Sequence, residues 1–112
     1  MSERITQFRQ KLSTSPENLL FKYSLAQALF EENHFDEAIE LFEECIADRE
    51  DWMLVALYLG KAYLEKGNSG RAENYLNLTI ELGQKQNHDD PVEEAKQLLA
   101  TCLLYTSDAA DE

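Results

Sequence analysis

The sequence is poor in cysteine and histidine. Cys45 and Cys102 are the only cysteines among 112 residues, and they form no spacing motif. Without such a motif reduced thiols are favoured over a disulfide, and Cys45 beside Ile46 is interpreted as a small packing residue. His34 and His88 also lack a second histidine or a cysteine at ligand spacing. The sequence therefore predicts no metal site and no cofactor.

Two short segments offer alternatives to this interpretation. His88, Asp89 and Asp90 could bind a metal, although a solvated loop in which Asp90 caps the next helix explains them better. The stretch KGNSGRA has two glycines, but it resembles a helix–turn–helix junction rather than a phosphate-binding loop. The adjacent carboxylates at residues 31–32 and 43–44 are expected on a solvated face. No catalytic residue is predicted, and the chain is expected not to be an enzyme.

Proline, glycine and long apolar runs are scarce as well. Two prolines and four glycines are compatible with long helices and short connections. No run approaches the roughly 18 apolar residues of a transmembrane helix, and the polar start MSERITQFRQK lacks the core of a signal peptide. The 44% hydrophobic content is ordinary for one folded domain. A cytoplasmic location in a bacterial cell is expected.

Positive charge is in short supply too. Ten lysines and arginines face 22 acidic residues, which gives a net charge of −12. Such a field repels phosphate backbones and anionic lipids, so neither nucleic acid nor a membrane is expected as a partner. The acidic surface of a soluble protein explains this charge, and an acidic docking face for a basic partner is the alternative.

What the sequence does contain is helical periodicity, without any strand pattern. Apolar residues recur at i, i+3 and i+7 along most of the chain. Ser2 and Ser15 are expected N-caps, Pro16 is placed in a first turn, and Gly67 is expected as a left-handed C-cap. Six helices are expected, at about residues 3–13, 15–32, 35–48, 52–66, 69–82 and 90–100, with a loop at residues 83–90.

The chain also resembles itself at a shift of 34 residues. LAQALFEENHFDEA and LGKAYLEKGNSGRA begin at Leu25 and Leu59, 34 residues apart. The small residues coincide in the pairs Ala26–Gly60 and Ala38–Ala72. Small side chains allow two helices to cross closely, while the large apolar residues between them fill the space. A fixed period with two helices per period indicates a helical solenoid.

These residues resemble the tetratricopeptide repeat family. YLGKAYLEKGNSGRAENYL carries the family's large–small pair, the later aromatic, the turn glycine and the alanine that follows. SLAQALFEENHFDEAIELF matches with Asn33 in place of that glycine, whereas Lys22 and Ala56 depart from an expected aromatic. The resemblance implies an all-α fold: a right-handed α-solenoid of antiparallel helix hairpins with about six helices.

The period divides the chain into five segments. The expected segments are an N-terminal helix from a degenerate half repeat at residues 1–14, a first repeat at 15–50, a second at 51–84, a loop with a capping helix or the start of a third repeat at 85–101, and a tail at 102–112. Solenoids usually need about three repeats and a polar cap. Marginal stability is therefore expected.

The tail has an unusual sequence. CLLYTSDAADE, residues 102–112, resembles the translation of a transposon-end adapter used in DNA library preparation. We interpret these residues as artefactual and expect the natural chain to continue past residue 101; a genuine polar tail is the alternative.

In this family the first helix of each pair lines a concave groove. The resemblance implies a groove lined by Tyr23, Gln27 and Phe30 from one repeat and by Leu57, Lys61 and Leu64 from the next. Packing against neighbouring helices is the alternative for Tyr23, Phe30 and Leu64. One subset of the family binds a peptide's terminal carboxylate through Lys and Asn. Tyr23, Gln27 and Tyr58 stand at those positions here, so no such clamp is expected.

The leading functional hypothesis is a non-catalytic scaffold that binds a protein, as a peptide or a partner helix, in this groove. One alternative is a helical appendage of a larger, enzymatic protein that continues after residue 101. Another is a self-association module, in which an exposed terminal repeat stacks on a second copy to form a homo-oligomer.

Overall fold

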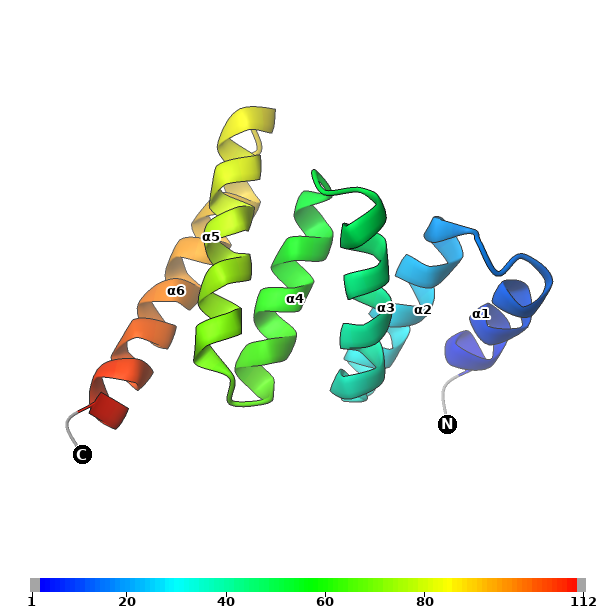
Figure 1. Cartoon of the computed structure of the whole chain (residues 1–112), viewed down its shortest axis with the longest axis horizontal. Coiled ribbons are helices and arrows are strands. Elements are labelled where there is room, and N and C mark those ends of the chain that lie inside the picture. The colour runs from blue at the N-terminus through cyan, green and yellow to red at the C-terminus, as the bar shows by residue number, and fades with distance from the viewer. Residues whose placement is uncertain (1–2, 111–112) are drawn as a thin grey trace.

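The computed structural model describes the backbone of residues 3–110 and the side chains of residues 3–101. This part of the chain contains six α-helices and no strand: α1 (Glu3–Thr14), α2 (Leu19–Glu31), α3 (Phe35–Asp48), α4 (Met53–Glu65), α5 (Ser69–Gln86) and α6 (Asp89–Ala110). Successive helices run antiparallel and stand side by side in an elongated row (Figure 1). The predicted all-α class and the six helices are confirmed. The expected cap at Ser2 lies outside the described residues.

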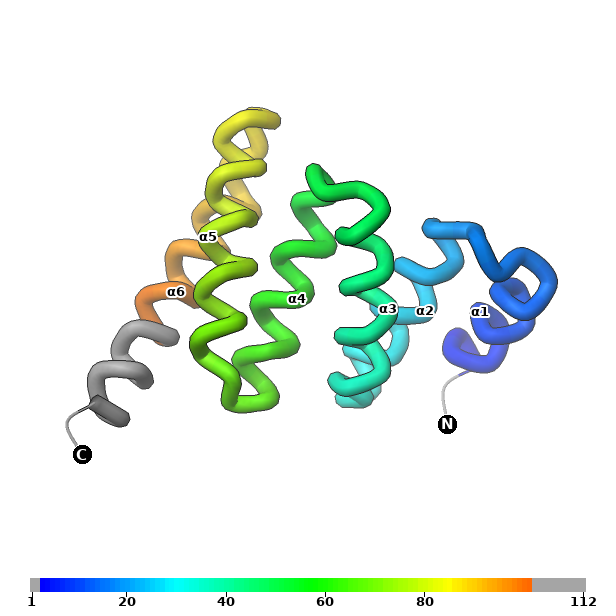
Figure 2. The backbone as a smooth tube through the Cα atoms, in the orientation of Figure 1, coloured from blue at the N-terminus to red at the C-terminus, as the bar shows by residue number. Residues whose placement is uncertain are grey.

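The helices form two layers. Cα atoms of α4 come within 8 Å of Cα atoms of both α2 and α6. No Cα atom in the described part of α1, α3 or α5 comes that close to another of these three helices. Because α2, α4 and α6 are more closely spaced, the row curves toward them and they form the inner, concave layer. Figure 2 shows α2 and α6 behind α3 and α5.

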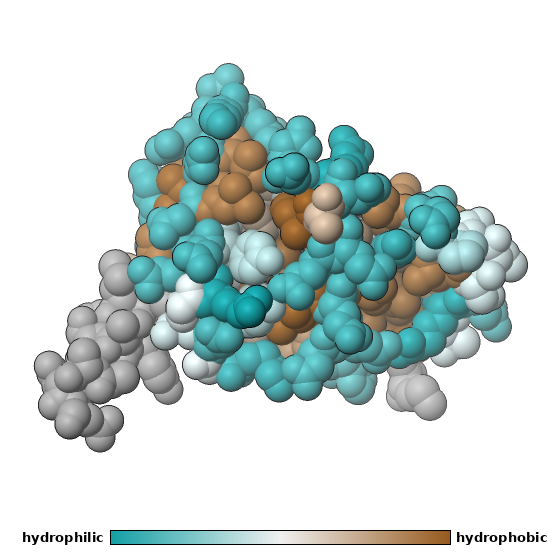
Figure 3. Space-filling model, in the orientation of Figure 1, coloured by the Kyte–Doolittle hydropathy of each residue, from teal (hydrophilic) through white to brown (hydrophobic). Residues whose placement is uncertain are grey.

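Small residues allow this close spacing. Ala26, Ala38 and Ala72 are fully buried, and a Cβ atom added at Gly60 would lie 2.6 Å from Cδ2 of Leu76. A side chain at Gly60 would therefore push α5 away from α4. The large residues that fill the core between these crossings include Leu29, Phe42, Leu59 and Leu76. The packing role predicted for the repeated small residues agrees with this burial. On the face seen in Figure 3, hydrophilic side chains cover the helices, and hydrophobic ones show in the furrows between them.

The two interhelical turns within the hairpins are built alike. Asn33 and Gly67 both have positive φ angles, of 65° and 77°. After each of them, a backbone N–H donates to a carbonyl five residues earlier: His34 to Leu29, and Asn68 to Tyr63. Asparagine tolerates the left-handed conformation better than other non-glycine residues, so it replaces the family's turn glycine here.

The predicted start of the second helix is wrong. Pro16 lies in a turn that follows Ser15, and α2 begins only after Asn18. The side-chain oxygen of Asn18 accepts from the backbone N–H of Phe21 at 3.0 Å, and that contact makes Asn18 the N-cap. Ser15 continues the preceding helix instead, since its N–H donates to the carbonyl of Lys11. Both Ser and Asn are good caps, and sequence alone did not decide between them.

The predicted loop at residues 83–90 is also wrong. Helix α5 continues to Gln86, and Asn87 then ends it in the left-handed conformation with φ 59°. Asp90, the expected cap, is already inside α6. Gly83 is buried in the contact between the two helices, where an added Cβ would lie 2.3 Å from Cγ2 of Val92. The glycine that indicated a loop in the sequence thus allows a close helix–helix contact.

Candidate protein-binding face

A polar ladder crosses the inner layer. The side-chain amide of Gln27 on α2 donates to the phenol oxygen of Tyr58 on α4 at 2.8 Å. The ammonium of Lys61, one turn further along α4, lies 5.6 Å from the centre of the Tyr58 ring. The same ammonium forms an ion pair with Glu94 on α6. These four residues, which we name the inner ladder, connect all three inner helices, and two of them, Gln27 and Lys61, were predicted from the sequence.

An aromatic cluster lies beside the ladder. Tyr23 stacks on Trp52 with ring centres 5.0 Å apart, and its edge also meets Tyr58 at 6.2 Å. Phe30 meets the edges of Phe35 and Tyr58 at 5.4 and 5.3 Å. Burial raises the pKa of the Tyr23 phenol, so the hydroxyl stays neutral at physiological pH. Tyr23 and Phe30 are half-buried, which means that they support the core and still present part of their surface to solvent.

The other two predicted groove residues differ in exposure. Leu64 is half-buried between the two halves of the core. Leu57 is only 5% exposed and packs against Leu76 of α5 and Ala95 of α6. A side chain so covered offers almost no area to a partner, so Leu57 is a packing residue of the α4–α6 contact.

Sequence reasoning missed two exposed leucines. Leu20 and Leu54 are 63% and 42% exposed, and each lies near the start of an inner helix. They stand 34 residues apart, so the shift that aligns Leu25 with Leu59 also aligns them. That shift was the available signal, because a large apolar residue repeated at a position off the packing stripe indicates a repeated surface feature. Tyr58 and Glu94 were not predicted as groove residues. Their roles depend on contacts with Gln27 and Lys61, and such contacts leave no periodic pattern in the sequence.

The buried thiol is unsuited to chemistry. Cys45 is fully buried on α3, and its thiol lies 3.8 Å from the carbonyl oxygen of Leu19. Burial raises the pKa of this thiol to about 11, with Lys22 acting weakly in the opposite direction. A thiol with such a pKa is almost entirely protonated at neutral pH, and the thiolate is the reactive form. Cys45 therefore fills space, as its position beside Ile46 predicted.

Between α4 and the two outer helices α3 and α5, two tyrosines share one carboxylate. The hydroxyls of Tyr63 and Tyr75 donate to the same oxygen of Glu43, at 2.6 and 3.4 Å, and the two rings stack 5.9 Å apart. Arg71 lies over the Tyr63 ring and 4.0 Å from Glu43. Burial, followed by the negative charge of Glu43, raises the pKa of Tyr75 to about 12. This group connects α3, α4 and α5.

The described residues also bear on metal binding and on membrane insertion. No three His, Cys, Asp or Glu side chains within them are grouped closely enough to hold a metal ion. None of their helices has both the length and the apolar character needed to cross a bilayer. The inner face presents hydrogen-bonding groups, the Lys61–Glu94 ion pair and partly exposed apolar side chains.

Paired antiparallel helices in two curved layers define a helical repeat protein of the tetratricopeptide type, and solved structures agree. A protein of Bordetella parapertussis matches with a TM-score of 0.80 and 17% identity over 92% of this chain and 90% of that one. The TPR2B domain of yeast Sti1, in complex with pHsp70, matches with a TM-score of 0.80 and 17% identity over 89% and 80%. A tetratricopeptide repeat domain protein from Salinibacter ruber matches with a TM-score of 0.69 and 23% identity over 78% and 88%. At these identities the likeness concerns the fold, and it confirms the tetratricopeptide-like solenoid.

The chain belongs to the family described as Regulator of microtubule dynamics protein 1-3, whose model matches residues 19–103. That range includes the four helices from α2 to α5 and most of α6, and therefore nearly all of both repeats expected from the sequence. No curated protein matches the chain.

Proposed function

We propose that this protein is a non-catalytic module that binds a protein partner, as a peptide or a helix, on the concave face of α2, α4 and α6. The observation that carries the proposal is the inner ladder flanked by half-buried Tyr23, Phe30 and Leu64. Such a surface combines apolar area with fixed donors and acceptors, which is what a bound segment requires. The Sti1 domain with the same fold occurs in a complex with pHsp70, which supports a protein as the class of ligand.

The mechanism is recognition on a preformed surface. The inner helices are held by the buried core, so a partner would order little of this protein on binding. Lys61 is already paired with Glu94, and a partner carboxylate or carbonyl would have to compete for it. The family description makes a protein of the microtubule system the first partner to examine. The cytoplasmic location and the bacterial origin stay predictions.

Charge reversal on the two layers tests the binding face. The full chain, immobilised, would capture partners from an extract of the source cell. Lys61→Glu reverses a charge on the inner ladder, whereas Lys85→Glu reverses one on the outer helix α5, where Lys85 pairs only with Glu81. The matched Lys85→Glu variant keeps the same net charge as Lys61→Glu. We expect Lys61→Glu to weaken capture at least tenfold and Lys85→Glu to leave it unchanged. Equal capture by both variants would reject the concave face as the site.

Self-association is a second candidate with an observation of its own. Leu98 and Leu99 on α6 pack on the core but remain half-exposed. A second copy stacked on α6 would cover them, as neighbouring repeats cover each other in solenoids. Sedimentation velocity over a hundredfold range of concentration decides this: a constant sedimentation coefficient would exclude it.

A further inference from the structure

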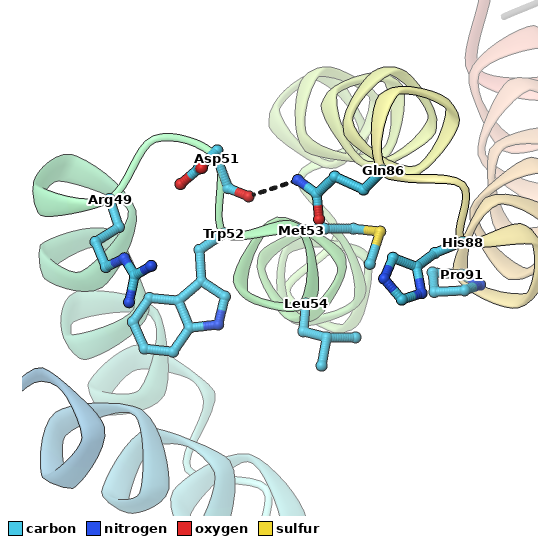
Figure 4. Close-up of a pocket in the computed structure, with 8 residues that line it drawn as sticks. All are labelled: Arg49, Asp51, Trp52, Met53, Leu54, Gln86, His88 and Pro91. Carbon is cyan, nitrogen blue, oxygen red and sulfur yellow. Dashed lines mark hydrogen bonds between the residues drawn. The ribbon is translucent and has the colours of Figure 1, made fainter.

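A cleft without any inner-ladder residue in its lining lies beside the first turn of α4, next to the α3–α4 loop. Its volume is about 460 Å³, and it is open to solvent. Figure 4 shows its eight lining residues: Arg49, Asp51, Trp52, Met53, Leu54, Gln86, His88 and Pro91. They come from the α3–α4 loop, the first turn of α4, the last turn of α5, the α5–α6 turn and the first turn of α6. We name this the end cleft.

The extension of α5 builds one wall of the end cleft. The last turn of α5, which was expected to be a loop, carries Gln86 to the α3–α4 loop, where its side-chain amide donates to the carbonyl oxygen of Asp51 at 3.0 Å (Figure 4). That hydrogen bond ties the two walls together. The cleft is therefore a defined structure, and it depends on the last turn of α5.

The floor is apolar. Leu54 is 42% exposed here, although a leucine is usually buried in a core, and Met53, Trp52 and Pro91 surround it. The indole nitrogen of Trp52 is turned toward Leu54, and Arg49 lies over the indole ring with its guanidinium 5.6 Å from the ring centre (Figure 4). A free indole N–H beside exposed methyl groups suits a peptide, which offers an apolar side chain and a carbonyl oxygen together.

The rim carries negative charge. Asp51 lines the cleft, and Glu50, Asp89 and Asp90 are chain neighbours of lining residues; all four side chains are exposed. No basic side chain in the described part of the chain lies within ion-pair distance of any of these four carboxylates, and Arg49 is the one arginine or lysine that lines the cleft. Carboxylates in the two segments that flank an apolar floor attract a segment with positive charges on both sides of an apolar residue. A second copy of this chain, with a net charge of −12, would be repelled.

We propose that the end cleft is a second docking site, which takes a leucine-like side chain of a partner segment whose flanking lysines or arginines meet the carboxylates of the rim. No residue of the inner ladder lines the end cleft, although Trp52 also stacks on Tyr23 of the concave face, and this proposal does not depend on the function proposed for that face. A single bound side chain gives weak affinity by itself, so the end cleft would add specificity to a partner that also contacts the concave face.

Trp52 provides the assay, because it is the only tryptophan in the chain. The probe is a nine-residue synthetic peptide with one leucine between two pairs of lysines, titrated into the full chain while tryptophan emission is recorded. A saturable change is expected. Replacing the leucine of the probe by alanine should weaken binding at least tenfold, and replacing its lysines by glutamates should abolish it. No saturable change up to millimolar probe, or equal binding of the glutamate probe, would overturn the proposal.

Two leucine variants locate the binding. Leu54→Ser removes the exposed floor and should weaken the probe at least tenfold. Leu20→Ser is the matched control, because Leu20 holds the equivalent repeat position, is even more exposed and lies outside the cleft. Both replaced side chains are largely exposed, so both variants should fold, which far-ultraviolet circular dichroism verifies. Equal affinity of the two variants for the probe would reject the end cleft. The Lys61→Glu variant should bind the probe as tightly as the unchanged chain, so failure of the concave-face proposal would be seen separately.

Discussion

Replacing Gly83 by alanine should destabilise the packing of α6 on α5. The added Cβ would lie 2.3 Å from Cγ2 of Val92 and 3.2 Å from the carbonyl oxygen of His88, whereas ordinary contacts begin at 3.4 Å. Val92 is 7% exposed, and a valine in a helix has one strongly preferred rotamer, so it has no easy way to move aside. The clash with the backbone oxygen can be relieved only by a shift of the α5–α6 turn.

The size of the effect follows from two opposing terms. Overpacking a tight contact costs about 1–3 kcal/mol. Alanine in place of glycine inside a helix returns about 1 kcal/mol. A net loss of about 1 kcal/mol in the free energy of unfolding is therefore expected, which lowers Tm by about 4–8 °C in a domain of this size. Thermal unfolding followed by circular dichroism measures it.

Gly70→Ala is the matched control for this substitution. Gly70 is exposed in the first turn of α5, and the nearest atom to an added Cβ is Oδ1 of Asn68 at 3.9 Å. The same chemical change without a clash should leave Tm unchanged or raise it slightly. If Gly83→Ala also unfolded at or above the Tm of the unchanged chain, Gly83 would lie in an open loop and the contact between α5 and α6 would be refuted.

Three further predictions concern single side chains. Leu57→Ala should lower the free energy of unfolding, measured with urea, by about 2–4 kcal/mol because it leaves a cavity in a buried site. A loss below about 1 kcal/mol would show that Leu57 is not a packing residue. In a Cys102→Ser variant, Cys45 should react with a thiol reagent at pH 8 only as fast as the protein unfolds, since burial raises its pKa to about 11; rapid labelling of the folded chain would contradict this. Burial and Glu43 raise the pKa of Tyr75 to about 12, so the neutral phenol is favoured in the folded state. Its contribution to stability is present below about pH 10 and lost as the pH rises toward 12, so the stability gap between the unchanged chain and Tyr75→Phe should close over that range; a constant gap would refute the assignment.

The fold followed from the sequence to a large extent, because it depends on repeated features. Ala26 and Gly60 recur at one spacing with a chain of large apolar residues around them, and such a pattern has few solutions other than stacked hairpins. The two helix boundaries that were predicted wrongly depend on residues whose type is compatible with more than one structural role. Gly83 is a loop signal by propensity, yet a helix contact requires it because Val92 leaves no room for a side chain. Ser15 and Asn18 are both good caps, and the position of the turn decided between them.

The candidate site was only partly predictable. Gln27 and Lys61 were placed in the groove by the repeat period together with the family resemblance, and both belong to the inner ladder. Leu57 shares that period with Tyr23 but is buried against Leu76 and Ala95, whereas Tyr23 packs on Trp52 and Tyr58 and stays half-buried. The end cleft could not be foreseen, since it depends on the last turn of α5, which the sequence predicted to be a loop.

The most direct test of the central claim is a map of amide chemical shifts. The isotope-labelled full chain would be titrated with the protein captured by the immobilised chain. Binding on the concave face predicts the largest shift changes in α2 and α4, around Gln27, Tyr58 and Lys61, with α3 and the first turns of α5 nearly unchanged. Shift changes concentrated on α3 and α5 would place the partner on the outer layer and contradict the proposed function.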